Sequence, residues 1–240
     1  MFARCQLLKG LLCIVAGLLF LPGQAQAADA KRPNIVFCIA DDWGWPHAGC
    51  YGDRCVKTPN FDRLAKEGVL FENAYVSSPS CTPSRGAIIT GQQFFRLDQG
   101  ANLWCTWPEG KFAEYPALFQ KAGYHVGSYR KAWGPGKGQP GGKPYKTVDA
   151  FFAARPEGQP FCFWFGASDP HRPYDKGSGK KSGMKLEDVH LFPHYPDAEE
   201  VRSDVADYYF EVQRFDRDVG ELVARLEKMC ELDNTLIAVT

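Results

Sequence analysis

Short, continuous apolar runs alternate along this chain with longer segments in which apolar residues recur at helical spacing. Residues 35–40 and 161–165 are apolar at nearly every position, a pattern typical of strands buried on both faces. Residues 124–129 and 235–240 are predicted to be two further strands. Because predicted strands and helices alternate, the pattern predicts an α/β domain with a largely parallel sheet.

The helical segments have recognisable starts and stops. Thr58 and Pro59 are typical of an N-cap followed by a first-turn proline, and Gly68 ends the helix that they open. The spacing of apolar residues predicts three further helices, which cover residues 81–91, 116–122 and 197–230.

The first 27 residues have the pattern of a secretory signal peptide. Two basic residues precede an apolar run at residues 11–21, and an Ala-Gln-Ala cleavage sequence follows at residues 25–27. The apolar run is too short to span a bilayer. We therefore expect residues 28–240 to form one exported domain in a periplasmic, secreted or lysosome-like compartment, with no membrane attachment after cleavage.

Composition narrows the function classes. The chain has 28 basic and 28 acidic side chains, so it lacks the basic excess of a nucleic-acid-binding domain and no nucleic-acid partner is expected. Nine cysteines are present, two of them within the first 27 residues, so an odd number remains after cleavage. One thiol is therefore expected to have another use. Cys38 and Cys162 are expected to be core thiols, and a bridge between Cys50 and Cys55 is left open.

Charged side chains follow three predicted strands at the point where each strand ends. Asp41 and Asp42 follow the first strand, Lys131 follows the strand at residues 124–129, and an Asp-Pro-His-Arg sequence at residues 169–172 follows another. Ligands of open α/β sheets bind at this edge, so one site is expected there. Adjacent carboxylates repel unless a cation compensates them, and oxygen ligands suit Ca²⁺ or Mg²⁺. The competing interpretation of the Asp pair is a solvated strand end.

Cys81 opens the most specific motif of the chain, Cys-Thr-Pro-Ser-Arg followed by Gly-Ala-Ile-Ile-Thr-Gly. Arg85 lies one helical turn after Cys81, so its guanidinium is expected to reach back toward that residue. Positive charge there, together with the backbone N–H groups of the helix start, would stabilise an anion. The competing interpretation is a cysteine that only caps a helix N-terminus.

The motif at residues 81–91 resembles the sulfatase signature at every defined position. Four other segments strengthen the resemblance to the formylglycine-dependent sulfatases of the alkaline-phosphatase-like superfamily, namely residues 32–35, 58–69, 169–174 and 208–216. The last two look closest to the heparan N-sulfatase (sulfamidase) branch. The resemblance implies an alkaline-phosphatase-like three-layer α/β sandwich with a largely parallel central sheet. It also implies that residues 28–240 are the N-terminal part of a catalytic domain whose C-terminal part is missing.

The resemblance assigns the reacting groups. Cys81 would be oxidised to formylglycine by a formylglycine-generating enzyme during maturation. Asp41, Asp42 and the modified residue 81 would bind Ca²⁺, with Mg²⁺ as the alternative. Lys131 would bridge the formylglycine and the sulfate ester, Arg85 would stabilise the nucleophile, and the substrate would be a sulfated carbohydrate.

The loop after residues 161–165 and the residues after Lys131 complete the expected site. His171 is the candidate acid, because imidazole titrates in the range needed to protonate a leaving alcohol or amine. Asp169 and Arg172 are expected to bind substrate. The chain departs from the family's Lys-x-His pattern, because Trp133 stands where the histidine would be. Trp133 is expected to shape the pocket or to stack on a sugar ring.

The sequence therefore predicts hydrolysis of sulfate esters or N-sulfonates on a sulfated glycan. One alternative is an inactive secreted pseudoenzyme that binds sulfoglycans. The other is a phosphatase or phosphonate hydrolase of the same superfamily, since related folds host different chemistries.

Overall fold

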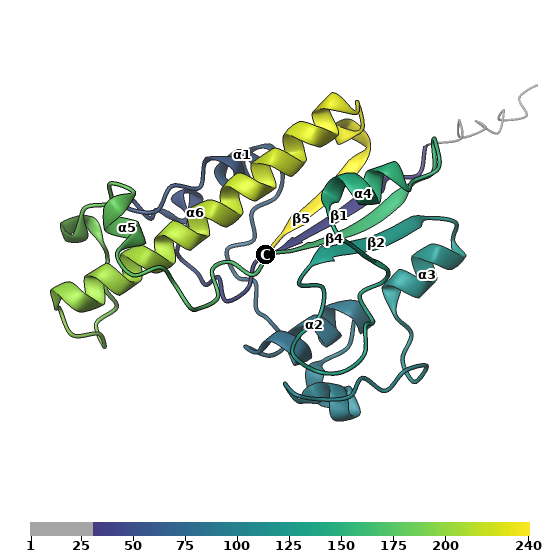
Figure 1. Ribbon diagram of the computed structural model, residues 1–240, viewed down its shortest axis with the longest axis horizontal. Coiled ribbons are helices and arrows are strands. Elements are labelled where there is room, and N and C mark those ends of the chain that lie inside the picture. Colours follow the sequence, from purple (N-terminus) through teal and green to yellow (C-terminus); the bar gives the residue numbers. More distant parts are fainter. Residues whose placement is uncertain (1–30) are drawn as a thin grey trace, which may run out of the picture. The chain divides into compact units, whose positions relative to one another are not determined.

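Five parallel strands form the central sheet of the computed structural model, which describes residues 31–240 (Figure 1). The predicted signal peptide at residues 1–27 lies outside the described residues. The strands are β1 (Asn34–Ile39), β2 (His125–Arg130), β3 (Pro144–Tyr145), β4 (Phe161–Gly166) and β5 (Thr235–Val239), in the order β3-β2-β4-β1-β5. The predicted parallel sheet is confirmed.

Helices cover both faces of this sheet (Figure 1). The longer helices are α1 (Pro59–Glu67), α2 (Cys81–Thr90), α3 (Tyr115–Lys121), α4 (Val148–Ala153) and α6 (Glu199–Lys228). Side chains of β4 alternate between the faces: Phe163 packs with α4 and α6, whereas Trp164 packs on the side of α2 and α3. All six residues of β4 are buried, because this strand is central in the sheet and has a helical layer on each side. The result is a three-layer arrangement.

The strand register places three strand ends side by side. Gly166, the last residue of β4, pairs with Ile39 of β1 and with Arg130 of β2. Backbone hydrogen bonds continue this alignment past the strands, because the N–H of Lys131 donates to Gly166 at 3.0 Å and that of Ala167 donates to Ile39 at 2.9 Å. The residues that follow β1, β2 and β4 therefore emerge at one edge of the sheet.

All four predicted helices are present, and each begins and ends within two residues of its predicted bounds, which were residues 58–68, 81–91, 116–122 and 197–230. Besides the 3₁₀ turns of the described residues, three short elements were not predicted: β3, α4 and the one-turn helix α5 (Ser178–Lys181). Their sequences are too short to show a period. The side chain of Thr147 caps α4 by accepting from the N–H of Ala150 at 3.0 Å. The buried Asp207 of α6 accepts from the N–H groups of Gly177 and Gly179, both at 2.8 Å, and so anchors α5.

The cysteines divide as the sequence suggests. Cys38 and Cys162 are buried in β1 and β4, which confirms them as core thiols. Each cysteine between residues 31 and 240 is a free thiol, so Cys50 and Cys55 are not bridged. Within the described residues, no helix is both long enough and apolar enough to cross a membrane.

Candidate active site

Three chain segments that lie far apart in the sequence bring reactive side chains together at the carboxyl edge of the sheet. Asp41 follows β1, Lys131 follows β2, and His171 lies in the loop after β4. Cys81 is the first residue of α2. The N–H of Asp41 donates to the carbonyl of Asp169 at 3.0 Å, which ties the first segment to the third.

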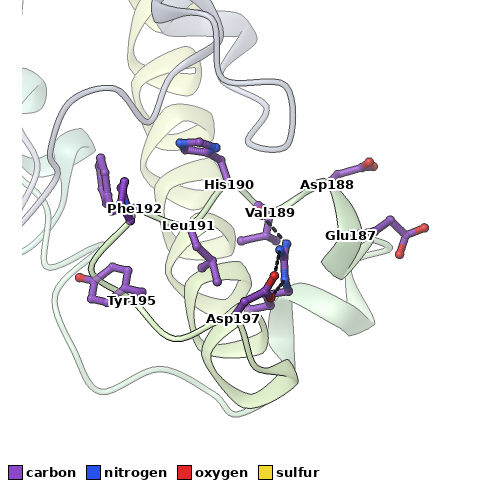
Figure 2. A pocket seen from close by; sticks show the side chains of 10 residues that line it. Glu187, Asp188, Val189, His190, Leu191, Phe192, Tyr195 and Asp197 are labelled. Atoms are coloured by element: carbon purple, nitrogen blue, oxygen red, sulfur yellow. Dashed lines mark hydrogen bonds and ion pairs between the residues drawn. The ribbon is translucent and has the colours of Figure 1, made fainter.

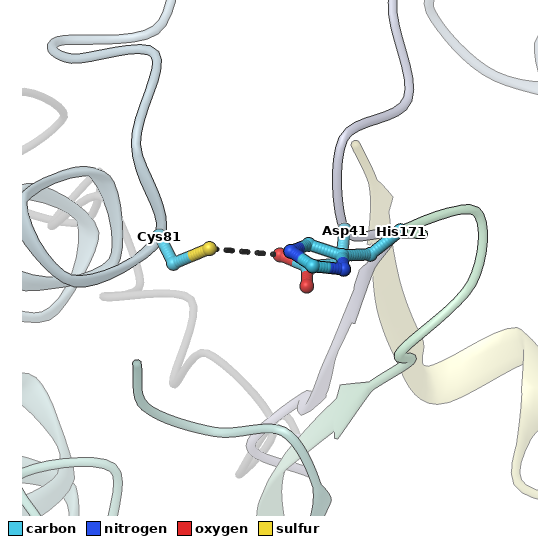
Figure 3. A group of neighbouring side chains, drawn as sticks. All are labelled: Asp41, Cys81 and His171. Carbon is cyan, nitrogen blue, oxygen red and sulfur yellow. Dashed lines mark hydrogen bonds between the residues drawn. The ribbon is translucent and has the colours of Figure 1, made fainter. Parts of the chain in front are cut away.

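The Cys81 thiol lies within contact distance of two charged groups. Its Sγ donates to Oδ1 of Asp41 at 3.5 Å and accepts from Nζ of Lys131 at 3.3 Å. Figure 3 shows the Cys81 side chain pointing toward Asp41, with the ring of His171 beside the carboxylate. Candidate ligand atoms of Asp41, Cys81 and His171 all lie within 4.8 Å of one another. The predicted nucleophile, one predicted metal ligand and the predicted acid therefore share one cluster.

Asp41 is the charged centre of this cluster, and only 3% of its surface is exposed. Its Oδ1 accepts from Nη2 of Arg85 at 3.2 Å, and its Oδ2 pairs with the ammonium of Lys131. Burial by itself would raise the pKa of Asp41, but the hydrogen bond from Lys131 and the charge of Arg85 outweigh burial and hold the pKa below its usual value. Asp41 therefore stays ionised, as a cation ligand must.

The environment of Cys81 does not favour a thiolate. Burial raises the pKa of the thiol, the neighbouring charge of Asp41 raises it further, and Lys131 compensates only in part. Reactive catalytic cysteines instead have a lowered pKa, because the thiolate is the nucleophile. Cys81 is thus poorly suited to act as a nucleophile while it is an unmodified thiol.

Arg85 reaches back toward Cys81 through a shared partner, because both side chains contact Oδ1 of Asp41. Arg85 is 2% exposed, and its guanidinium is hydrogen-bonded to Asp41 and to the carbonyl of Lys131 but to no atom of Cys81 among its described hydrogen bonds. The indole N–H of Trp164 donates to the same carbonyl at 3.3 Å, and the Arg85 guanidinium lies 6.0 Å from the Trp164 ring centroid. Arg85 and Trp164 therefore hold Asp41 and the backbone of Lys131 in place. Sequence reasoning missed Trp164, whose only signal is a tryptophan inside a phenylalanine-rich strand.

Asp42 and His171 form the exposed side of the cluster. The chain turns sharply after Asp41, because Asp42 has a positive φ of 68°. The Asp42 carboxylate, 58% exposed, lies 3.7 Å from Nε2 of His171. The two adjacent aspartates thus differ in environment, since one is enclosed and the other faces solvent.

The predicted substrate residues of the loop after β4 are already paired. Asp169 lies 3.4 Å from Nε of Arg214. Arg172 binds both carboxylate oxygens of Asp204 and lies 4.5 Å from the ring centroid of Tyr174. Because Arg172 remains exposed, an anionic group could still reach its guanidinium.

Trp133 is a core residue, which corrects the expectation that it stacks on a sugar ring. The side chain is 8% exposed and packs against Trp107 with ring centroids 5.0 Å apart in an edge-to-face arrangement. The next residue, Gly134, lies so close to α2 that a Cβ there would be 1.9 Å from Oγ1 of Thr82. Trp133 therefore shapes the site from behind, by packing the turn after Lys131 against α2.

The donor set fits a hard divalent cation. Asp41 supplies carboxylate oxygens, the ligands that Ca²⁺ and Mg²⁺ prefer, within the cluster that it forms with Cys81 and His171, whereas the Asp42 carboxylate lies beside His171. A thiol at position 81 is a poor ligand for these ions, whereas an oxygen at the same place would suit them. The residues present therefore fit the ion that the sequence suggests, provided that position 81 carries oxygen.

A surface cavity of about 450 Å³ has a lining, drawn in Figure 2, that includes no residue of this cluster. It is lined by residues 187–193 together with Tyr195, Asp197 and Arg202. The Arg202 guanidinium already binds Asp197 at 2.6 Å and the carbonyl of Val189 at 2.7 Å. None of the predicted site residues lines this cavity.

The pairing of Asp41 with Arg85 predicts a pH-dependent loss of stability. Asp41→Asn should lower the free energy of unfolding by roughly 3–5 kcal/mol at neutral pH, because it leaves the buried Arg85 without its charged partner. A depressed carboxylate pKa contributes stability above the unfolded value of about 3.9, and this stability is lost as pH falls through the folded pKa. The difference between the two proteins should therefore shrink as the pH is lowered toward the folded pKa.

Urea unfolding of both proteins at neutral and acidic pH measures this difference. Asp42→Asn is the matched control, because Asp42 is exposed, and its effect should stay within about 1 kcal/mol. An Asp41→Asn effect that is equally large at all pH values, or equal to that of Asp42→Asn, would contradict the assignment.

Comparisons with known proteins agree with this geometry. Residues 33–147 match the family model described as Sulfatase. The ulvan-active sulfatase of Formosa agariphila is 29% identical over 234 residues, which cover 89% of this chain and 45% of that protein. This chain therefore spans about half the length of that relative.

Two solved structures have the same fold. The phosphonate monoester hydrolase of Agrobacterium radiobacter has a TM-score of 0.72 at 15% identity, and the match covers 87% of this chain and 62% of that chain. A structure solved in complex with its substrate D-glucosamine-2-N,6-O-disulfate has a TM-score of 0.66 at 21% identity, covering 87% and 65%. These neighbours confirm the alkaline-phosphatase-like fold, whereas the heparan N-sulfatase branch stays a prediction. The chain therefore resembles the sulfatase family, whose model matches residues 33–147.

Proposed function

We propose that this chain forms part of a hydrolase that removes sulfate from sulfate esters or N-sulfonates of a sulfated glycan, using formylglycine made from Cys81 and a bound divalent cation. The observation that carries the proposal is the position of Cys81 at the start of α2, in contact with both Asp41 and Lys131. The names of one relative and one structural neighbour support a carbohydrate substrate, since the relative is named as ulvan-active and the neighbour was solved with a disulfated glucosamine.

Formylglycine at position 81 and a bound divalent cation would together supply the chemistry at the sulfur atom of the substrate. Formylglycine at position 81 would supply the nucleophilic oxygen, and a divalent cation held by Asp41 and Asp42 would supply positive charge for the sulfate oxygens. Sγ of Cys81 stands in for the attacking oxygen. Lys131, at 3.3 Å from that atom, would donate hydrogen bonds to the nucleophile and to a sulfate oxygen.

The remaining residues orient the reacting groups and move the proton. Arg85 holds the Asp41 carboxylate and the Lys131 carbonyl from the buried side. His171 lies at the exposed side, where the leaving alcohol or amine would depart, and there its imidazole would donate a proton to the leaving oxygen or nitrogen. Because Trp133 replaces the second family imidazole, His171 is the imidazole that the described cluster offers.

Maturation and location complete the proposal. A formylglycine-generating enzyme would convert Cys81 before or during export, and the signal peptide would direct the protein to a periplasmic, secreted or lysosome-like compartment. The resemblance of residues 169–174 and 208–216 to the sulfamidase branch favours a sulfated amino sugar as substrate.

Modification of Cys81 tests the proposal directly. In protein isolated from its native host, the tryptic peptide of residues 67–85 should be lighter than the unmodified peptide. The difference should equal the mass change when the CH₂–SH side chain of Cys81 becomes an aldehyde. The same peptide from a Cys81→Ser variant provides the matched control for aldehyde-specific labelling. Native protein with only the unmodified thiol would contradict the formylglycine mechanism.

The role of His171 is tested by varying the leaving group. His171→Gln in the full-length protein should lower kcat on a sugar sulfate about 10²–10⁴-fold, because the sugar alkoxide needs a proton as it leaves. The loss should be much smaller on a nitrophenyl sulfate, whose leaving group is stable as an anion. His190→Gln, in the separate surface cavity, is the control.

Equal losses on both substrates would show that His171 is not the acid. Glycan binding without sulfate release by modified protein would favour the pseudoenzyme alternative. Faster turnover of a phosphate or phosphonate ester than of a sulfate ester would favour the phosphatase or phosphonate hydrolase alternative.

A further inference from the structure

We propose that the Lys131 ammonium and a divalent cation bind the same oxygen of Asp41, so that cation binding releases Lys131 toward residue 81 and the substrate. This inference rests on the cation use proposed above. The inference adds an energetic coupling, because binding of the ion would free Lys131 to bind the sulfate group.

The first step concerns the two carboxylate oxygens of Asp41, both of which already have partners. Its Oδ1 accepts from Arg85 at 3.2 Å and lies 3.5 Å from Sγ of Cys81. Its Oδ2 is bound by the ammonium of Lys131. An ion bound to a carboxylate lies about 2.3–2.6 Å from the oxygen, and two cations in contact with one oxygen repel strongly where water is scarce. The ion and Lys131 therefore exclude each other at Oδ2.

The second step is that Lys131, and not Arg85, is able to move. The guanidinium of Arg85 is enclosed and is held by both Asp41 and the Lys131 carbonyl. The Lys131 backbone is equally fixed, because its N–H donates to Gly166 and its carbonyl accepts from Trp164. Its side chain, however, is unbranched and partly exposed. The ammonium can therefore leave Asp41 while the backbone stays in place.

The third step is the charge balance of the cluster. Among the described carboxylate, guanidinium and ammonium groups of the site, Asp41 and Asp42 carry two negative charges, which Arg85 and Lys131 offset. A divalent cation in this balanced cluster leaves an excess of positive charge. A sulfate group of the substrate would offset that excess, with the released Lys131 as one of its hydrogen-bond donors. Cation and sulfated substrate should therefore strengthen each other's binding, as reciprocal linkage requires.

Calcium titration calorimetry of the full-length protein tests the competition. Lys131→Met removes the competing ammonium but keeps the length of the side chain, and it should bind Ca²⁺ about tenfold more tightly than the wild type. Arg130→Met is the matched control, because Arg130 carries the same charge one residue earlier but pairs with Asp218 of α6. Its Ca²⁺ affinity should stay within about twofold of the wild type, since charges outside the cluster are screened. Circular dichroism establishes that each variant is folded.

A second measurement does not depend on a variant. The rate at which an amine reagent labels Lys131, read by mass spectrometry, should rise when Ca²⁺ is added, because the ammonium is no longer bound to Asp41. Equal or weaker Ca²⁺ affinity of Lys131→Met, a labelling rate unaffected by Ca²⁺, or no Ca²⁺ binding by any of the three proteins would overturn the inference.

These outcomes separate this inference from the proposed function. Sulfate release together with unchanged Ca²⁺ affinity of Lys131→Met would overturn the competition and leave the hydrolase in place. If Lys131→Met binds Ca²⁺ more tightly but Cys81 is never modified, the competition between Lys131 and the ion stands and the proposed hydrolase mechanism is overturned.

Discussion

The enclosed carboxylate of Asp41 is the interaction on which the rest of the site depends. A buried carboxylate is costly unless charged hydrogen-bond donors compensate it, and here Arg85 and Lys131 do so from two different segments of the chain. The same contacts bring Lys131 to the Cys81 thiol and fix the start of α2 against the sheet. Removal of this one charge would leave a buried guanidinium without its charged partner, and would leave α2 and the segment after β2 without their common partner.

Sheet topology makes this meeting possible. Parallel strands of equal register end at one edge, and β4 aligns the ends of β1 and β2 on its two sides. Each strand then contributes a different kind of group, namely carboxylates after β1, an ammonium after β2 and an imidazole after β4. The nucleophile comes from a helix that packs on one face of the sheet, so the site combines two of the three layers.

Much of this arrangement could be predicted from the sequence, because it depends on local patterns. Continuous apolar runs identify β1 and β4, and the charged residues directly after them are placed by the parallel topology alone. Side-chain direction could not be predicted in the same way. Arg85 does lie one turn after Cys81, but the carbonyl of Lys131, distant in sequence, decides where its guanidinium binds. Likewise, the exposure of Trp133 depends on Trp107 and on the close approach of Gly134 to α2, which no local pattern encodes.

The central claim is that position 81, held between Asp41 and Lys131, becomes the nucleophile only after it is converted to formylglycine. The most direct test compares preparations of the full-length protein that differ in the fraction of Cys81 converted, with that fraction measured by mass spectrometry and turnover measured on a sulfated sugar. We expect turnover to rise in proportion to the converted fraction and to reach zero when no Cys81 is converted. Equal turnover in unconverted and fully converted protein would contradict the account.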